Sequence, residues 1–428
     1  MNPTFRIATA MSLLFFVVSA RAEVLTLEQA VKIAITEDPW LVASEQRQSA
    51  SMAMSEGASY LPDPKFNLGM ANFPTDTFNY RQEPMTQMQM GVSQMFPRGD
   101  SLALQSEIFL EKSQMMPIQR EVRRAQVRLA VSLLWLDNLR ATSSIELIEQ
   151  NRGLFEQLSE LVVSSYSNSL GRTRQQDLVR AELELDQLDD RLVQLRQQQF
   201  ASRAKLSEWI PAIGTGAFEL DSALTMSSEQ IAERSLEEIT QLIAQHPSIR
   251  QVAQSIEIAD TEVALAEQKY EPEWVLNASY GYRGDDLRGN PRADLFSVGV
   301  SVDIPIFSSK RQDAQVQAEI YERESIKTDR LVTLRNLVAS YQALSAEIEQ
   351  LDARLALYNQ RLLPGLDEGA EAATNAYTTD DGNFNTVIQA RISELNAKLA
   401  LLAIQTERNK KIAELHYLLT GTSEGDAS

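Results

Sequence analysis

The sequence predicts a mainly α-helical protein with a small β part, built from a duplicated unit of helix, strand, strand, long helix and helix. Three observations lead to this prediction. The two halves of the chain match one another at a nearly constant offset. Long stretches of both halves carry apolar residues at heptad-like spacing, which is typical of packed helices. Each half also holds two segments of about ten residues in which apolar and polar side chains alternate, as they do in strands.

The first element is a secretory signal, which we predict at residues 1–22. Arg6 supplies the positive charge, Ile7 to Val18 is apolar, and Ala20-Arg21-Ala22 has the small residues of a cleavage site. A membrane anchor is the alternative, but an apolar run of about 12 residues is too short to cross a bilayer of about 30 Å. We therefore expect cleavage before Glu23 and export of the mature chain.

An internal repeat organises the rest of the chain. Five short matches link its two halves, with an offset that stays between 208 and 212 residues. The matched positions are Asp38-Pro39 with His246-Pro247, Tyr60 with Tyr270, Gly91 with Gly299, Ile108 with Ile320, and Gly171 with Gly382. We therefore predict a first structural repeat over 23–235, a second over 236–420 and a flexible tail over 421–428.

The helices of each repeat follow from helix-forming composition and from the positions of prolines. They are expected over 27–60, 101–166 and 173–209 in the first repeat, and over 236–270, 310–377 and 385–419 in the second. Pro39 and Pro247 predict a bend or break in the opening helices, and Pro117 is the one interior breaker in the first long helix. The returning helices carry leucine and isoleucine at coiled-coil spacing, at Leu178, Leu185, Leu188, Leu192, Leu195, Ile392, Leu395, Leu399 and Leu402.

The strands are expected over 65–73 and 86–96 in the first repeat and over 273–283 and 294–304 in the second. In the last of them, Phe296, Val298 and Val300 alternate with small polar residues, and aromatic residues gather near the strand ends. This pattern is typical of membrane-barrel strands, although a soluble sheet with one buried face shows the same alternation. Four strands cannot close a wide barrel alone, whereas a trimer would contribute twelve.

Composition argues against catalysis and against nucleic acid. The 428-residue chain has no cysteine, which excludes disulfides, thiolate nucleophiles and cysteine metal sites. His246 precedes a proline at an expected helix end, and His416 lies in a helical run where packing or solvation is commoner than ligation. The sequence has no nucleophile–base set, Gly-rich phosphate loop or metal-ligand spacing. We expect no enzyme, no cofactor and no metal site, and the formal charge of −19 disfavours nucleic acid.

Several motifs, in order, resemble those of the TolC-type outer-membrane efflux family over nearly the whole mature chain. They are T-L-E-Q-A at Thr26, D-P at Asp38, Y-L-P-D-P at Tyr60, G-V-S-Q-M-F-P at Gly91, Y-E-P at Tyr270 and G-V-S-V-D-I-P-I-F at Gly299. The resemblance implies a homotrimer in which a 12-stranded β-barrel in the outer membrane continues into a long α-helical periplasmic barrel. It also implies a passive exit duct that partners with a periplasmic adaptor (membrane fusion) protein and an inner-membrane RND-type pump.

By the same resemblance, the turns around Gly171 and Gly382 would form the periplasmic tip. Some members of the family narrow the tip with an aspartate pair in a D-x-x-D-A pattern. Here Thr386 and Gln389 stand at the two aspartate positions of that pattern. Asp177, Asp380 and Asp381 lie close to the two turns instead, and three copies of them would make an acidic ring that attracts cations. Ordinary exposed turn aspartates remain the other interpretation.

The segment Q-E-P-M-T-Q-M-Q-M-G-V-S-Q-M-F-P resembles the branch of the family that serves heavy-metal resistance pumps. Its thioethers, at Met85, Met88, Met90 and Met95, suit soft cations, but Met88 and Met90 share the apolar parity and are expected to face lipid. Two other kinds of protein stay open: a periplasmic coiled-coil adaptor and a secreted helical stalk protein. The helices fit both of these, and only the strands separate them from the duct.

Overall fold

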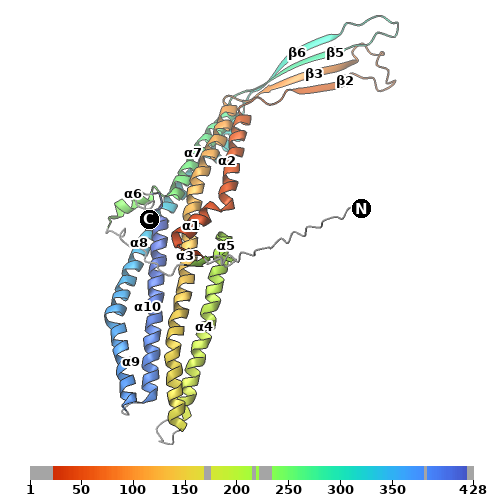
Figure 1. Cartoon of the computed structure of the whole chain (residues 1–428). Coiled ribbons are helices and arrows are strands. Elements are labelled where there is room, and N and C mark those ends of the chain that lie inside the picture. The colour runs from red at the N-terminus through yellow and green to blue at the C-terminus, as the bar shows by residue number, and fades with distance from the viewer. Residues whose placement is uncertain (1–22, 168–174, 215–217, 221–233, 380–382, 422–428) are drawn as a thin grey trace, which may run out of the picture. The chain divides into compact units, whose positions relative to one another are not determined.

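The computed structural model describes residues 23–167, 175–214, 218–220, 234–379 and 383–421. Helices form most of it, and the sheet of the strands β2, β3, β5 and β6 forms its main β part. The predicted fold class, mainly α with a small β part, is confirmed. Figure 1 shows the elements in chain order.

The first half of the chain contains α1 (Leu27–Thr36), α2 (Pro39–Ala58), β2 (Lys65–Ala71), β3 (Gln87–Phe96), α3 (Ser101–Ser167) and α4 (Gln175–Trp209). The second half contains α6 (Leu236–Ile243), α7 (Pro247–Glu267), the 3-10 turn η1 (Gln268–Tyr270), β5 (Glu273–Tyr282), β6 (Leu295–Asp303), α8 (Ser308–Leu357), the π turn η2 (Tyr358–Leu362), α9 (Leu363–Thr378) and α10 (Phe384–Leu418). Between them lie α5 (Pro211–Gly214) and the short strand β4 (Phe218–Leu220), which pairs in parallel with β1 (Glu23–Leu25).

The second helix of each half, α2 or α7, starts at a proline that follows a capping residue. Asp38 accepts a hydrogen bond from the Trp40 N–H and begins α2, and His246 accepts one from the Ser248 N–H and begins α7. In both cases the proline occupies the first turn, where its missing N–H is harmless. The breaks expected at Pro39 and Pro247 therefore separate α1 from α2 and α6 from α7.

Two prolines in the long helices behave differently from one another. Pro117 lies inside α3, which continues through it. The helix expected over 310–377 is instead interrupted by the π turn Tyr358–Leu362, where the Leu363 N–H donates to the Tyr358 carbonyl. Pro364 follows in the first turn of α9, so this change of hydrogen-bond pattern comes directly before a residue that cannot donate.

The described chain forms two compact units, and each of them draws residues from both sequence repeats. We call Met1–Glu37, Ala130–Met226 and Leu351–Lys410 the hairpin unit. We call Asp38–Leu129, Ser227–Gln350 and Lys411–Ser428 the sheet unit.

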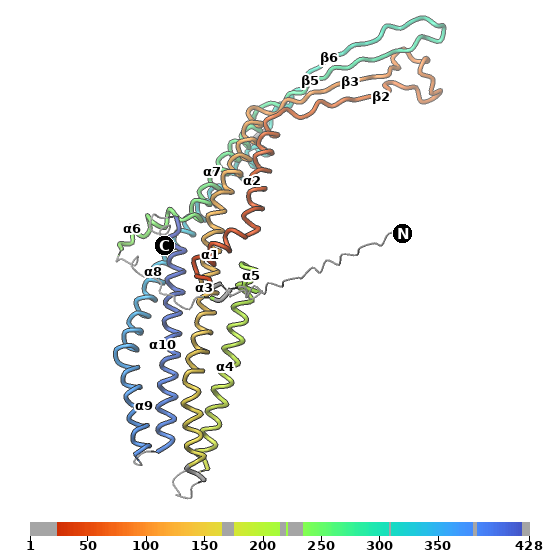
Figure 2. The backbone as a smooth tube through the Cα atoms, in the orientation of Figure 1, coloured from red at the N-terminus to blue at the C-terminus, as the bar shows by residue number. Residues whose placement is uncertain are grey.

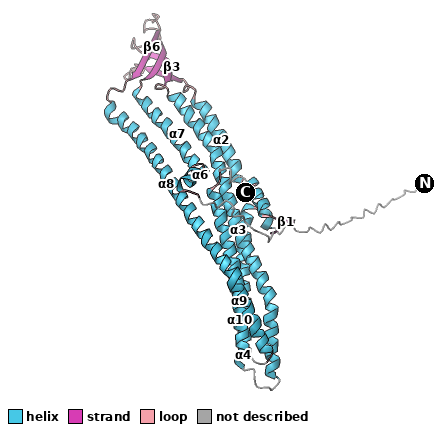
Figure 3. Ribbon diagram, turned by 90° about the vertical axis from the view of Figure 1, so that its left-hand side faces the viewer, coloured by secondary structure: helices cyan, strands magenta, loops and turns pink. Residues whose placement is uncertain are grey.

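The sheet unit combines the sheet with the helices that lead into it. The strands run in the order β2-β3-β5-β6, and all three neighbouring pairs are antiparallel. They extend beyond the ends of α2 and α7 (Figures 2 and 3). Side chains join both helices to α3: Ser55 of α2 hydrogen-bonds Ser106, and Arg250 of α7 pairs with Glu121. The sheet is therefore continuous with a packed bundle of helices.

The hairpin unit is held by one apolar cluster to which α3, α4 and α10 all contribute. Its largest buried members include Phe155 of α3, Leu192 of α4 and Ile388 of α10, each at most 3% exposed. The predicted coiled-coil positions Leu188, Leu192 and Leu395 are buried in this cluster, and Leu178, Leu185, Leu195, Ile392 and Leu399 pack against it. The cluster therefore joins the returning helices of both repeats.

Candidate membrane surface and hairpin tip

One face of the sheet is apolar across all of its strands. The register places Leu68, Met90, Tyr280 and Phe296 in one row and Phe66, Val92, Ala278 and Val298 in the next. Alternate residues of a strand point to the same side, so both rows share a face. Their side chains are open to the surroundings, with Phe66 65%, Phe296 71% and Val298 62% exposed. A large contiguous apolar patch of this kind marks a surface that something else covers.

The opposite face is lined mainly by small and polar residues, with Leu295, Val275 and Met95 as apolar members. The row Asn67, Gly91, Ser279 and Ser297 lies on it, followed by the row Gly69, Gln89, Gly281 and Leu295. Gly281 leaves room for the Gln87 side chain, because a Cβ at this glycine would collide with the Gln87 amide oxygen. This sheet is thus amphipathic across its thickness, as a strand layer between lipid and a water-filled lumen has to be.

Charged residues on the polar face stand at the end of the sheet that joins the helices. Glu273 and Asp303 are direct cross-strand neighbours. Arg98, which follows β3, forms an ion pair with Asp303 and donates to the Glu271 carbonyl over 2.8 Å. The guanidinium offsets the repulsion between the two carboxylates and joins the end of β3 to both β5 and β6.

The two loops at the other end of the sheet are joined by arginines. Arg283 Nη1 donates to the Pro84 carbonyl over 3.3 Å, and Arg292 donates to the carbonyls of Glu83 and Arg81 over 3.0 and 3.3 Å. The Tyr80 ring lies so close to Gly284 that a Cβ there would clash with it. The loop between β2 and β3 is therefore ordered by the loop between β5 and β6.

Aromatic side chains gather near both ends of the apolar face. Phe96 and Trp274 are cross-strand neighbours at the helix end, whereas Tyr280, Tyr282 and Phe296 lie toward the loop end. Aromatic rings at two levels, among them the amphipathic rings of tryptophan and tyrosine, are typical of the interfaces of a membrane. Within the described ranges, no helix combines the length and the apolar character that a membrane crossing requires.

The methionines of the first strand pair do not converge on one site. Met88 and Met90 lie on the apolar face, where Met88 is the cross-strand partner of Met70. Met95 belongs to the opposite parity of β3 and so to the polar face, and Met85 precedes the strand. Among the described residues, no group of three or more histidine, aspartate or glutamate side chains is placed to hold a metal ion.

The predicted tip residues are only partly described. Gly171, Asp380, Asp381 and Gly382 lie outside the described residues. Asp177, in the first turn of α4, is only 6% exposed and accepts a 3.4 Å hydrogen bond from the side-chain amide of Asn385 in α10. Thr386 and Gln389 are exposed on α10. The structure thus places Asp177 between two helices of the hairpin unit, whereas Thr386 and Gln389 lie on its surface.

Sequence reasoning missed Asn385 as the partner of Asp177. It also missed the link between Arg191 of α4 and Asn396 of α10, whose atoms are 2.6 Å apart. Both asparagines lie in the same helix and both partners lie in α4, 205 and 208 residues earlier in the chain. The Asp177–Asn385 separation equals the lower end of the duplication offset, which is the one sequence signal that relates these two positions, and the Arg191–Asn396 separation falls just below that range.

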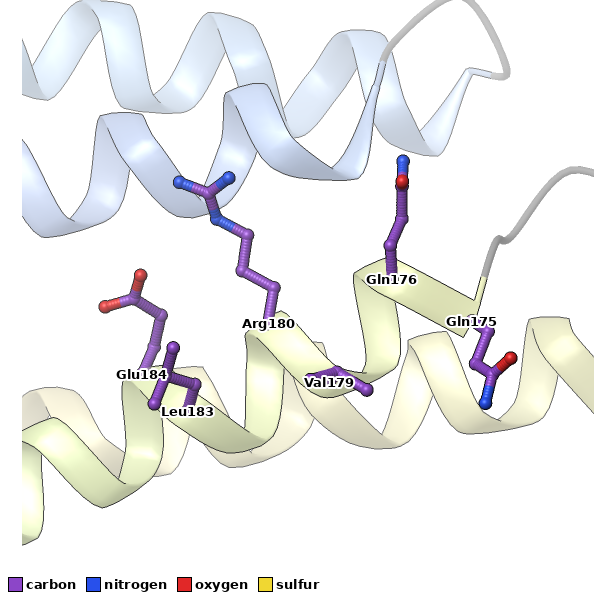
Figure 4. A pocket seen from close by; sticks show the side chains of 6 residues that line it. All are labelled: Gln175, Gln176, Val179, Arg180, Leu183 and Glu184. Atoms are coloured by element: carbon purple, nitrogen blue, oxygen red, sulfur yellow. The ribbon is translucent and has the colours of Figure 1, made fainter.

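An open groove lies along the start of α4. It has a volume of about 500 Å³ and is lined by Gln175, Gln176, Val179, Arg180, Leu183 and Glu184. Figure 4 shows Arg180 and Glu184 extending to one side of the helix and Gln175 to the other. Val179 is 56% and Leu183 52% exposed, so the groove is a surface that another helix can cover.

Comparisons with known proteins agree with this geometry. Residues 239–421 match the family model described as outer membrane efflux protein. No curated protein matches the chain. The solved structures that resemble it include CusC (15% identity, TM-score 0.74, covering 92% of this chain and 91% of that one), VceC of Vibrio cholerae (15%, 0.74, 92% and 96%) and the Campylobacter jejuni CmeC outer membrane channel (12%, 0.74, 98% and 94%).

The fold is therefore that of the outer-membrane efflux channels. The predicted resemblance to the TolC-type outer-membrane efflux family is confirmed, with the family match itself lying in the second half of the chain.

Proposed function

We propose that this chain is the outer-membrane exit duct of a tripartite efflux system. In this role it performs no reaction. It gives solutes a path out of the cell after an inner-membrane RND-type pump and a periplasmic adaptor have delivered them. The family match and the structural likenesses support an efflux duct, and the partners are part of the proposal.

The amphipathic sheet is the observation that carries the proposal. Its apolar rows are exposed in the single chain, and the strands β3 and β5, of ten residues each, have the length that a tilted crossing of a bilayer needs. Backbone groups in hydrocarbon must be hydrogen-bonded, so an open sheet cannot stay in lipid. Within the described chain, β2 and β6 are the edges of this sheet. If β2 of one copy paired with β6 of a neighbouring copy, the backbone groups of both edge strands would be hydrogen-bonded.

A homotrimer follows from strand arithmetic together with the family likeness. Three copies of the four-stranded sheet make twelve strands, enough for a barrel with an open polar lumen. The helices would continue the barrel into the periplasm. Exposed apolar side chains along α4, such as Val179 and Leu183, are suited to contact helices of a neighbouring copy.

The cargo is proposed from resemblance. The methionine-rich segment around Met88 resembles that of ducts for heavy-metal cations, and such cations are our proposed cargo class. Its thioethers lie on different faces, so β3 has no methionine site that would select the cargo. We infer that the pump makes the choice and that the duct conducts what it receives.

Fractionation followed by native mass measurement tests the proposal. The expressed protein is expected in the outer membrane, and its detergent-extracted form is expected to have three times the mass of the mature chain. A soluble periplasmic monomer would contradict the duct and favour the secreted helical stalk protein. An inner-membrane or adaptor-like distribution would favour the coiled-coil adaptor instead.

An acidic ring at the tip remains part of the proposal, and Asp177→Asn tests its first member. Asparagine keeps an oxygen that can accept from Asn385 but removes the charge. In planar bilayers with a salt gradient, a ring that includes Asp177 predicts that Asp177→Asn shifts the reversal potential toward lower cation preference. Asp380→Asn with Asp381→Asn is the matched variant for the other turn.

The burial of Asp177 allows a second outcome of that experiment. If Asp177→Asn leaves the reversal potential unchanged while Asp177→Ala loosens the hairpin unit in limited proteolysis, Asp177 joins α4 to α10 and does not line the ring. The proposed ring would then rest on Asp380 and Asp381 alone.

A further inference from the structure

The duplicated unit uses two different chemistries at the same joint. In the first half, Asp38 Oδ1 accepts from the Trp40 N–H over 2.9 Å, and Asp38 Oδ2 accepts from Arg123 Nε over 2.7 Å. In the second half, His246 Nδ1 accepts from the Ser248 N–H over 3.2 Å, and His246 Nε2 lies 3.1 Å from the Tyr417 carbonyl oxygen. An imidazole thus replaces an ion-paired carboxylate as the cap of the matching helix.

These two contacts of His246 require one protonation state. The Ser248 N–H can only donate, so Nδ1 must carry its lone pair. The Tyr417 carbonyl can only accept, so Nε2 must carry the proton. The neutral Nε2–H tautomer meets both demands. A protonated ring has donors at both nitrogens, and it would leave the Ser248 N–H without its acceptor.

The surroundings of His246 are closed and apolar. Its side chain is fully buried, its ring meets the Tyr417 ring edge-on at 5.2 Å, and Ile243 and Ile249 are buried on either side in sequence. Gly421 lies at a φ of +86°, and a Cβ at this position would lie 3.1 Å from the Gln245 carbonyl oxygen and 3.3 Å from Pro247 Cδ. The end of α10 therefore packs directly onto the α6–α7 joint, and the imidazole lies in this contact.

The charged groups of the elements around this joint have other partners. Arg250 of α7 pairs with Glu121 of α3. Lys411 of α10 pairs with Glu347 of α8 and with Glu414 of its own helix. Glu238 of α6 caps its own helix at Ser235. Besides burial, the charge of Arg128 in α3 lowers the pKa of the other histidine, His416, rather than that of His246. None of these pairs offers a carboxylate to a charged His246.

We propose that the contact of His246 with Ser248 and Tyr417 is an acid-sensitive latch, which holds the C-terminal turn of α10 on the α6–α7 joint while the imidazole is neutral and releases it on protonation. The inference is independent of the proposed efflux role, because it uses only contacts within the sheet unit.

The direction of the pH effect follows from burial. Burial lowers the pKa of His246 below its ordinary value of 6.5, and the Tyr417 carbonyl opposes this only in part. Burial, with Arg128, also lowers the pKa of His416. A group whose pKa is lower in the folded state binds more protons when released. The latch is therefore fully stable above the ordinary pKa and loses stability as the pH falls from there toward the lowered pKa of the folded state.

Hydrogen exchange of the full chain in detergent, at pH 7.5 and at pH 5, tests the latch. Protection factors, which correct for intrinsic exchange, are expected to fall in acid at Ser248 and at Leu419, whose N–H donates to the Leu415 and His416 carbonyls at the end of α10. The expected fall is about tenfold for each unit by which the pKa is lowered, with a limit of about 30-fold set by the distance of pH 5 from the ordinary value of 6.5. The Trp40 amide at the Asp38 cap serves as an internal reference, and its protection factor should not fall in acid with that of Ser248. Equal changes at Trp40 and Ser248, or no change at Ser248, would overturn the proposal.

Two variants assign the effect to one imidazole. His246→Asn keeps an acceptor for the Ser248 N–H but has no titrating ring, so its protection at Ser248 should be the same at both pH values. His416→Gln is the matched control and should keep the full acid response. Loss of the response in His416→Gln alone would make His416 the sensor and refute the latch.

A spectroscopic measurement keeps the test decisive if His246→Asn does not fold. The chain has two histidines, so selective ¹⁵N-histidine labelling gives two rings, and His416→Gln assigns them. At pH 7.5 the His246 ring should show the Nε2–H tautomer, and it should titrate at a lower pH than a free histidine side chain. An Nδ1–H tautomer, or a charged ring at that pH, would rule out the latch.

Discussion

Val298→Arg is expected to keep the chain out of the outer membrane. Val298 lies in the middle of β6, is 62% exposed, and shares its row of the apolar face with Phe66 and Val92. An arginine on the lipid face of a barrel strand costs about 2–4 kcal/mol at the bilayer midplane. Each copy in an oligomer carries this penalty. The measurement is the amount of protein in the outer-membrane fraction, compared with total expression.

Ser297→Arg is the matched control for that substitution. Ser297 is the neighbouring residue of β6 and lies on the polar face, in the row of Asn67 and Ser279. If that face lines an aqueous lumen, the guanidinium stays hydrated and insertion should remain near the wild-type level. Equal loss in both variants would point to a general defect of folding. Normal insertion of Val298→Arg would contradict a lipid-facing sheet.

Phe155→Ala is expected to cause a large loss of stability in the hairpin unit. Phe155 is 3% exposed within the apolar cluster that α3, α4 and α10 share. Truncating a buried phenylalanine removes its transfer free energy and leaves a cavity, at a cost of about 3–5 kcal/mol. We expect the midpoint of denaturant unfolding, followed by circular dichroism, to fall clearly in the purified protein.

Gln157→Ala separates this effect from helix propensity. Gln157 is exposed, lies two residues along the same helix and gains propensity as alanine, so its unfolding midpoint should change little. A loss in Gln157→Ala as large as that in Phe155→Ala would show that the cluster does not govern the unfolding transition. Because the chain has two compact units, limited proteolysis should accompany the optical signal and locate the unit that opens.

Local sequence predicted much of the secondary structure. The breaks at Pro39 and Pro247 are predictable because a proline has no N–H to donate and clashes with the preceding turn inside a helix, whereas the first turn of a new helix tolerates it. The parity of β6 was readable because strands alternate their side chains with a period of two. The π turn before Pro364 was not predicted, since a helix can accept a proline by continuing through it, as at Pro117, or by changing its hydrogen-bond pattern.

The candidate tip was less predictable than the sheet. Asp177 stands near a turn in the sequence, which favours exposure, yet the chain buries it beside Asn385. Proximity along the chain does not determine which side chains share a surface.

The sequence by itself determined the helix starts, the two faces of each strand, the order of elements in each half and the resemblance to an efflux family. These features depend on residues that are close in the sequence and on side-chain patterns that repeat every two to four residues. They can therefore be predicted without knowing how the chain folds in space. Only the tertiary structure decided which distant residues meet: Arg98 with Asp303, Asp177 with Asn385, and His246 with Tyr417. Such contacts join positions 171 to 208 residues apart, and no local propensity specifies a partner at that distance.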